Sequence, residues 1–487
     1  MKNVKKRFRG AMLAAVCLLF TAGLISVKSG VIELYASELT TESSEGKSPE
    51  GAESSESERE ATEKAESSKG DASETAATEL SGISTEKTAD SQSEMGTLPS
   101  RWYAGDVGRK PTVKTQGSYG TCWALTATSA LETALLPEQR IVFSADHLTH
   151  RNSFTASVND GGDYLMLMAY LCSWQGPVTE EEDPYGDEYS PDGLEAAVHV
   201  QEVRVFLDST IEKIKETVYT YGSVQTSLYM DRTTAADDSG YYNESTFSYY
   251  YTDEMTQNHD VLILGWDDSW SAAQFETTPD QDGAFICLNT WGSDFGDDGI
   301  FYVSYSDPNI AQIAVAYTRI DAADNYDNLY QYDECGWQGQ QGYDSEACWF
   351  ANVYTAEGEE TLAAVGFYAT GENTSYDIYL VHDFADTDSF DAMEYLQSGS
   401  FSDMGYYTVD LEETQKLTEG ERFAIVIKIS TPDVSNPVAV EYRADEYTQN
   451  VTCEGKESYL SQYGSLWENT QEKFEANVCL KVYTWNQ

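Results

Sequence analysis

Basic residues are scarce in this chain. Its 487 residues include 29 lysines and arginines against 83 aspartates and glutamates, which gives a formal net charge of −54 at pH 7. A field of that sign repels phosphate backbones and anionic lipid headgroups, so we expect no nucleic-acid partner and no peripheral membrane binding. The same negative potential attracts cationic partners, although a need for solubility explains an acidic surface equally well.

Cysteine is also sparse, at eight residues in 487. A disulfide scaffold has a far higher cysteine density, so the fold must rest mainly on burial of apolar side chains. Four cysteines fall in the C-terminal third, where export would permit disulfides, but their spacing leaves the pairing open and matches no C-x-x-C metal motif. These four are Cys335, Cys348, Cys453 and Cys479.

Aromatic residues are absent between Ser37 and Leu98, where Glu, Ser, Thr, Ala, Lys and Gly make up almost the whole sequence. Such a composition cannot bury enough apolar area to offset the entropy of ordering. We therefore expect residues 37–98 to form a disordered, acidic spacer. A propeptide is the alternative interpretation.

The first 36 residues have the composition of a secretory signal. Basic residues precede an uncharged, mostly apolar run of 18 residues from Gly10 to Val27. With cleavage near Ala36 we expect a secreted, extracellular protein whose mature form has no membrane part. The run approaches the roughly 20 residues that span a bilayer, so an uncleaved anchor is the alternative.

Residues 99–320 have the pattern of an α+β enzyme domain. A helix is indicated by Ala127, Leu131, Ala134 and Leu135, which share one face, with Pro137 just beyond as a stop. Later segments are short, rich in β-branched and aromatic residues, and separated by Gly and Asp turns, which is typical of strands. They are 261–266, 284–289 and 300–305.

Residues 326–487 form a second region, in which short strands dominate and helical patterns are few. Their spacing favours an all-β sandwich or jelly roll. Strands are predicted at 362–369, 376–381, 406–411, 423–429 and 478–485. The polar stretch 321–327 is a natural boundary, so we expect the two regions to be separable.

A candidate nucleophile lies at the start of the predicted helix. The run Q-G-S-Y-G-T-C-W, from Gln116 to Trp123, places Cys122 after a glycine-containing loop. A helix N-terminus presents unpaired N–H groups and a partial positive charge, which favour a thiolate over a thiol. We therefore expect a lowered pKa at Cys122. The alternative is an ordinary buried cysteine that acts as a small apolar residue.

Two further segments complete a pattern. They are N-H-D-V-L-I-L-G-W-D-D, which contains His259, and N-T-W-G-S-D-F-G-D-D-G-I-F-Y-V, which starts at Asn289. In this order, with a glutamine six residues before the cysteine, the three segments resemble the papain family of cysteine peptidases. The resemblance implies a peptidase with a helical lobe and a β-barrel-like lobe.

The resemblance also implies the role of each residue. Cys122 would attack the scissile carbonyl, His259 would act as base and acid, and Asn289 would orient the imidazole. Gln116 would donate a hydrogen bond in the oxyanion hole. Trp291 would shield the His–Asn bond and border the bound substrate. In the same way Gly161 and Gly162 resemble the glycine pair along which the substrate backbone lies.

Residues 176–185 and the region after Asn325 resemble surface-associated peptidases of anaerobic Gram-positive bacteria, which carry a lectin-like β-domain. This resemblance implies cell-surface association, protein or peptide substrates, and a cell-surface glycan as a further partner. The helical inhibitory prosegment of papain relatives is replaced here by the acidic spacer. The resemblance therefore does not imply how the activity of this protein is restrained.

No cofactor or metal is expected in catalysis. In the β-domain an acidic cluster could supply oxygen ligands to a structural Ca²⁺, although a solvated loop explains these residues as well. The cluster comprises Asp383, Asp386, Asp388 and Asp391. The main alternative function is a catalytically silent adhesin that binds glycans or proteins through the β-domain. A peptidoglycan amidase or a transglutaminase-like acyl transferase would also use Cys and His, but the segments around Cys122 and Asn289 favour a peptidase.

Overall fold

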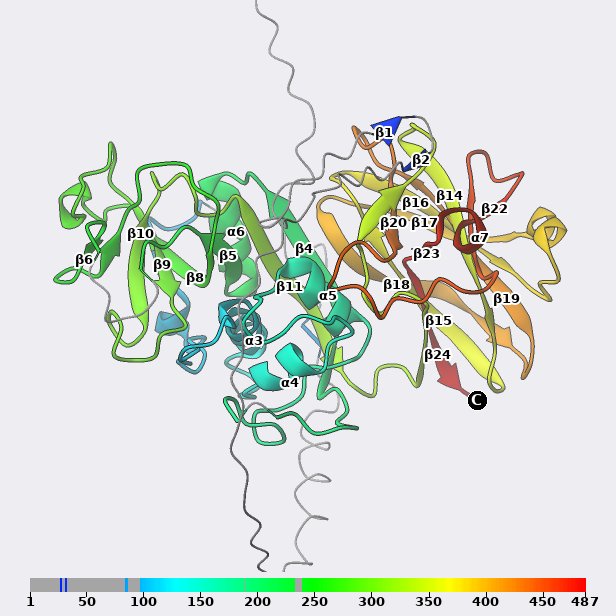
Figure 1. Ribbon diagram of the computed structural model, residues 1–487, viewed down its shortest axis with the longest axis horizontal. Helices are drawn as coiled ribbons and strands as arrows, with labels where there is room; N and C mark the ends of the chain where they lie inside the picture. Colours follow the sequence, from blue (N-terminus) through cyan, green and yellow to red (C-terminus); the bar gives the residue numbers. More distant parts are fainter. Residues whose placement is uncertain (1–26, 29–30, 33–83, 86–96, 188, 233–238) are drawn as a thin grey trace, which may run out of the picture. The chain divides into compact units, whose positions relative to one another are not determined.

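A computed structural model describes residues 27–28, 31–32, 84–85, 97–187, 189–232 and 239–487 of the chain (Figure 1). Nearly all of the predicted signal and of the predicted spacer lies outside these residues. Two short strands, β1 (Val27–Lys28) and β2 (Val31–Ile32), pair antiparallel and belong to a separate unit. Among the described residues, no helix combines the length and apolar character that a bilayer span requires.

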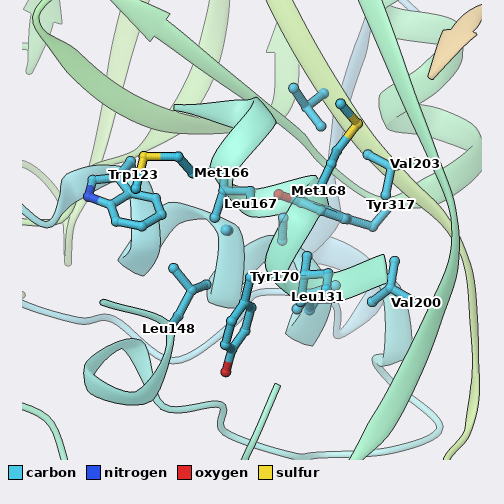
Figure 2. Packing of buried hydrophobic residues seen from close by; sticks show 14 of the residues in the cluster. Trp123, Leu131, Leu148, Met166, Leu167, Met168, Tyr170, Val200, Val203 and Tyr317 are labelled. Carbon is cyan, nitrogen blue, oxygen red and sulfur yellow. The ribbon is translucent and has the colours of Figure 1, made fainter. Parts of the chain in front are cut away.

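Three helices form one half of the region from residue 99 to about residue 320. They are α3 (Cys122–Leu135), α4 (Ala145–His150) and α5 (Tyr164–Cys172). Helix α3 ends before Pro137, as predicted. Asp163 is the N-cap of α5, and its carboxylate accepts hydrogen bonds from the N–H groups of Leu165 and Met166. Apolar side chains of these helices pack together and against β4, as Figure 2 shows for Leu131, Leu148, Leu167, Tyr170 and Val200.

The other half is an antiparallel arrangement of strands. Its main strands are β4 (Val198–Leu207), β5 (Val224–Leu228), β8 (His259–Asp267), β9 (Ala284–Leu288), β10 (Ile300–Ser304) and β11 (Ile313–Ala322). Helix α6 (Ile211–Tyr221) contacts β5, β8 and β11. A second apolar cluster here includes Trp266, Phe285 and Phe301. The shorter elements are β3 (Arg101–Tyr103), η1 (Ala104–Val107), β6 (Tyr242–Asn243), β7 (Ser248–Tyr249) and η2 (Ala272–Gln274).

The C-terminal region is built almost entirely of strands, as predicted. A six-stranded sheet has the order β17-β16-β19-β14-β21-β22, and β13, β20 and β23 form a smaller sheet. The apolar cluster that includes Phe350, Phe367 and Ile427 joins strands of the six-stranded sheet to β15, β18 and β24, which gives the expected sandwich. The bounds are β12 (Asn328–Tyr330), β13 (Gly339–Gln341), β14 (Ala347–Thr355), β15 (Glu360–Ala369), β16 (Thr374–Val381), η3 (Thr387–Ala392), β17 (Glu394–Phe401), β18 (Met404–Leu417), β19 (Arg422–Ser430), β20 (Val438–Glu441), β21 (Ser458–Ser461), β22 (Glu468–Asn469), α7 (Thr470–Phe474), β23 (Asn477–Val478) and β24 (Leu480–Asn486).

The two regions share one sheet. Strand order runs β12-β24-β15-β18-β4-β11-β5-β8-β9-β10-β7-β6, so β18 of the C-terminal region pairs directly with β4 (Figure 1). At this junction Gly405 has a φ of 150°, and a Cβ there would lie 1.9 Å from the carbonyl oxygen of Val203. Only glycine fits this close approach of two backbones. The cluster shown in Figure 2 also continues across the junction to Trp337, Tyr368 and Tyr406.

Charged side chains also cross the junction. Asp403 accepts from Arg204 at 3.3 Å and from Lys213 at 2.8 Å, and Arg319 contacts Asp410 at 2.8 Å. The sequence boundary at residues 321–327 therefore separates two stretches of chain that share a sheet, an apolar cluster and ion pairs. This continuity is at odds with our expectation that the regions are separable.

One described piece of the predicted spacer makes ordered contacts. Ser84 forms a β-bridge with Asp321, and the N–H of Thr85 donates to the carbonyl oxygen of Ile320 at 3.0 Å. The hydroxyl of Thr85 accepts the N–H of Ile320 at 2.8 Å. At these two residues the chain extends the edge of β11, which differs from the prediction that residues 37–98 form a disordered spacer.

Candidate active site

The structure places Cys122 as the first residue of α3, half-buried, with Trp123 buried beside it. The sulfur of Cys122 accepts hydrogen bonds from the backbone N–H groups of Cys122, Trp123 and Asp260. Asp260 follows His259 directly on β8. Helix α3 packs along this strand, so the fold brings the cysteine and the histidine segments together.

The pKa of the Cys122 thiol moves in the direction opposite to our prediction. Burial and the neighbouring Asp260 carboxylate raise the pKa of Cys122 to about 12, although the three N–H groups at its sulfur lower it. The helix N-terminus thus contributes as expected, but desolvation of the thiolate is the larger effect. In the substrate-free protein burial and the Asp260 charge thus favour the thiol form of Cys122 over the thiolate.

His259 lies at the start of β8 and is 7% exposed. Its Nε2 donates to Oδ1 of Asn289 at 2.8 Å, and the same oxygen accepts the N–H of Thr290 at 2.7 Å. Burial lowers the pKa of His259 to about 4, against the opposing effect of the Asn289 hydrogen bond. The imidazole is therefore neutral at pH 7 and its Nδ1 is available to accept a proton.

Trp291 packs against this histidine. Its ring centroid lies 5.0 Å from that of His259 and 5.1 Å from that of Phe295. A ring held between a core phenylalanine and the imidazole limits water access to the His259–Asn289 bond. Two roles were predicted for Trp291, shielding of the His259–Asn289 bond and contact with substrate. This packing supports the shielding role.

Gln116 is held next to Asn289 by backbone pairing. Its N–H donates to the carbonyl oxygen of Thr290 at 2.8 Å, and Thr115 forms a β-bridge with Trp291. The Thr290 hydroxyl donates to Oε1 of Gln116 at 2.6 Å, while Nε2 donates to the carbonyl oxygen of Tyr119 at 2.8 Å. These two bonds fix which end of the amide is the donor, and Nε2 keeps a second hydrogen.

The glycine pair lies against the nucleophile's helix. Gly162 has no room for a side chain, because a Cβ would lie 2.5 Å from the Trp123 ring. Gly161 has a φ of 80° and open space around the Cβ position. At Gly120, in the loop before Cys122, an added Cβ would lie 3.1 Å from the carbonyl oxygen of Asn159. The segment around Gly161 and Gly162 thus borders the Cys122 loop, where substrate contact is expected.

Residues 99–318 match the model of the papain family of cysteine proteases. This part of the chain belongs to that family. Residues 329–484 match the model of a lectin-like domain. The regions that we predicted as a papain-like peptidase and a lectin-like β-domain are therefore confirmed in kind and in order.

Relatives of the papain-family part are distant. Cathepsin L of Sarcophaga peregrina is 24% identical over 216 residues, which cover 42% of this chain and 58% of that protein. The oryzain gamma chain of Oryza sativa subsp. japonica is 28% identical over 203 residues, or 39% of this chain and 50% of that protein. The chain thus spans no more than 58% of the length of the first curated relatives that it matches.

Solved structures show the same two-domain fold. The clostridial cysteine protease Cwp84 after propeptide cleavage superposes with a TM-score of 0.70 at 24% identity, covering 80% of this chain and all of that one. The cysteine protease and lectin-like domains of Cwp84, described as a surface layer associated protein of Clostridium difficile, give a TM-score of 0.68 at 24% identity, with 80% and 90% covered. The combination of both domains in one fold is therefore shared.

Several residues that support the papain-like site were missed by sequence reasoning. Tyr185 donates its hydroxyl to the carbonyl oxygen of Gln116 at 3.1 Å and lies 2.5 Å from the Thr121 hydroxyl, so it braces the loop before Cys122. Thr290 orients the Gln116 amide. Asp260 lay within the histidine motif, but nothing in the pattern indicated that this residue contacts the nucleophile.

Three other described histidines have structural partners away from this site. His147 bonds the Tyr170 hydroxyl at 2.7 Å, His199 stacks on Trp174 with centroids 3.8 Å apart, and His382 contacts Glu421. The described cysteines are all free thiols: Cys122, Cys172, Cys287, Cys335, Cys348, Cys453 and Cys479.

In the lectin-like domain the carboxylate of Asp386 accepts the N–H of Asp388 and caps η3. In the part of the chain that the structure describes, no group of three or more His, Cys, Asp or Glu side chains could hold a metal ion. The predicted Ca²⁺ is still a prediction that only a binding measurement can test.

A buried ion pair fixes the loop that carries Gln116. Lys114 lies 2.7 Å from Glu132 of α3, with side chains 10% and 2% exposed. Lys114 also donates to the Thr128 hydroxyl at 2.6 Å, and Glu132 accepts the N–H groups of Thr112 and Phe143. These bonds attach the extended segment before the active-site loop to the helix that starts with Cys122.

We expect Glu132→Ala to lower the free energy of unfolding by about 3–5 kcal/mol, because it leaves the Lys114 ammonium buried without its partner. Equilibrium unfolding in urea measures this. The matched control is Glu472→Ala, which breaks the exposed pair with Lys456 and should change stability by less than about 1 kcal/mol. Equal effects of the two substitutions would contradict the assignment of Glu132 as an anchor.

Proposed function

We propose that this chain is a secreted cysteine endopeptidase that hydrolyses peptide bonds through a thioester at Cys122. The observation that carries the proposal is the 2.8 Å hydrogen bond from His259 to Asn289 in a fold that sets Cys122 against the same strand. It leaves one imidazole nitrogen for the thiol and fixes the other.

In the proposed reaction His259 Nδ1 takes the proton of the Cys122 thiol as the sulfur attacks the scissile carbonyl carbon. Because burial favours the neutral form of both groups, we place the proton transfer together with the attack rather than before it. The C–N bond then breaks as His259 returns the proton to the leaving amine. A water molecule, deprotonated by His259, hydrolyses the thioester, releases the carboxylic acid and restores the thiol.

The negative charge that develops on the carbonyl oxygen needs donors at a fixed position. The free N–H of Gln116 Nε2 and the backbone N–H of Cys122 are the proposed pair. Thr290 and Tyr119 hold the Gln116 amide from both ends, so little reorganisation is needed as the charge forms. Asn289 keeps the imidazole in one orientation throughout the cycle, and Trp291 keeps water from that bond.

We expect Gln116→Ala to lower turnover by roughly 10²–10³ while Cys122 still reacts with an alkylating reagent, because one oxyanion donor is lost and the Cys–His pair is kept. Peptide turnover and thiol labelling are measured on the same sample. Thr290→Val is the matched variant, because it keeps the Gln116 donor but removes the hydrogen bond from the Thr290 hydroxyl that restrains it. Its turnover should lie between that of the wild-type protein and that of Gln116→Ala. Loss of labelling in step with turnover would show that Gln116 only holds the loop together.

The lectin-like domain and the predicted signal support action outside the cell, at or near its surface. Cwp84 is a surface layer associated protein, and we propose protein substrates of that location for this chain, with the lectin-like domain binding a glycan or a protein there. A silent adhesin is the alternative, which Cys122, His259, Asn289 and Gln116 disfavour because a scaffold has no need of them. A peptide library assay with and without a thiol-directed epoxide separates the two functions.

A further inference from the structure

Asp260 lies beside the nucleophile and has no part in the proposed chemical steps. It follows His259 on β8, and its backbone N–H donates to the sulfur of Cys122. Its carbonyl oxygen accepts the hydroxyl of Thr126, from α3, at 3.3 Å. The main chain of Asp260 is therefore fixed against the helix of the nucleophile, and its carboxylate cannot move far from the reacting sulfur.

The partners of this carboxylate are neutral. Oδ1 accepts the hydroxyl of Ser227 at 2.6 Å, and Oδ2 accepts Nε2 of Gln225 at 2.9 Å. Gln225 is itself held by the Tyr317 hydroxyl at 2.9 Å. Two hydrogen bonds leave the carboxylate about half of its acceptor capacity. The residue as a whole is half-buried, so part of it stays accessible from solvent.

Among the described residues, no lysine, arginine or histidine forms a salt bridge with Asp260. The one other charged group that affects its pKa is Asp163, which raises it together with burial. Asp163 follows Gly161 and Gly162, where we expect the substrate backbone to lie. A carboxylate that is partly removed from water and faces a second carboxylate is unfavourable until a cation reaches it.

Two structural explanations account for part of this arrangement. Asp260 could serve only to join β8 to β5 through Ser227 and Gln225, or only to set the pKa of the Cys122 thiol. The first explanation accounts for two acceptor oxygens, because an asparagine would accept only one of these bonds and would turn its NH2 group toward the other donor. It leaves the net charge of the carboxylate without a partner. A carboxylate that raises the pKa of the nucleophile is a cost to catalysis, so the second explanation gives no reason for the charge.

We propose that Asp260 is a specificity-determining residue, whose carboxylate binds a lysine or arginine side chain of the substrate next to the scissile bond. The proposal rests on the peptidase function and names its substrate class. A cationic side chain that enters beside Cys122 gains an ion pair with Asp260, whereas a neutral side chain leaves the carboxylate unpaired and an acidic one is repelled.

The test uses the full chain and peptides that differ at one position near the scissile bond, where Lys, Arg, Met or Glu is placed in turn. At one position we expect kcat/KM for Lys and Arg to exceed that for Met by about tenfold or more, and Glu to be the poorest. Salt screens such a pair, so the ratio of Lys to Met should fall as sodium chloride is added to the wild-type protein.

Asp260→Asn should bring the ratio of Lys to Met close to one while the Met peptide is still cleaved. Ser227→Ala, which removes a neutral partner and keeps the charge, should retain the preference, as should Asp260→Glu. Labelling of Cys122 by a thiol-directed epoxide shows that each variant is folded.

A wild-type protein that cleaves the Met peptide as well as the Lys peptide at every position, or a preference that survives in folded Asp260→Asn, would overturn the inference. A wild-type protein that cleaves none of the peptides would instead contradict the proposed function, and this inference with it.

Discussion

Cys122→Ala is expected to abolish peptide hydrolysis and to leave the fold unchanged. Without the sulfur no thioester can form, and loss of the nucleophile in such a site typically costs about 10⁴-fold or more in turnover. Alanine is the best helix former and fits the first turn of α3. Turnover of a peptide substrate and far-ultraviolet circular dichroism together measure both parts of the prediction.

A second cysteine provides the control for this result. Cys453 is half-buried like Cys122 but lies in the lectin-like domain, so Cys453→Ala should keep wild-type turnover. Cys122→Ser keeps a nucleophilic atom of weaker reactivity and should be nearly silent as well. Turnover that persists in a folded Cys122→Ala protein would remove the assignment of the nucleophile.

Residues 97–320 expressed alone are expected to fail to fold cooperatively. Removal of the remainder exposes β4, which pairs with β18, and removes Trp337, Tyr368, Met404 and Tyr406 from the shared apolar cluster. At about 1.5–3 kcal/mol for each large buried side chain, these four alone account for roughly 6–12 kcal/mol. Whole domains are stable by only about 5–15 kcal/mol, so the loss is comparable to the total.

Thermal unfolding followed by circular dichroism, with gel filtration, compares this fragment with residues 97–487. The control keeps the junction and removes an exposed ring of the lectin-like domain, as in Tyr395→Ala, which should unfold like the parent. A monomeric fragment with a sharp transition and full peptide turnover would show that the shared sheet is dispensable, as the sequence suggested.

The sequence predicts local structure well and long-range pairing poorly. Helix α3 and strands β8, β9 and β10 fall within a few residues of the predicted segments, because periodicity and turn residues are local signals. The pairing of β4 with β18 joins residues about 200 positions apart in the chain. The sequence pattern of neither strand indicates which strand it pairs with. The polar stretch at 321–327 was therefore interpreted as a boundary between two independently folding domains.

At the candidate site, too, the sequence predicted the local motifs but not the effects of long-range contacts. Motifs placed Cys122, His259, Asn289 and Gln116 together, and the structure brings them to one place. The pKa of Cys122 was predicted in the wrong direction, because the helix N-terminus is visible in the sequence whereas burial and the neighbouring Asp260 carboxylate exist only in the folded chain. For the same reason Thr290 and Tyr185 carried no signal before their contacts were known.

The shared sheet also limits where such an enzyme can cut. A binding domain on a flexible linker raises the local concentration of every bond within its reach. Here the hydrogen-bonded junction between β4 and β18 replaces that linker with a rigid spacer. If the lectin-like domain held a large molecule, only those peptide bonds of that molecule that lie at one fixed distance and direction from the point of attachment would reach Cys122.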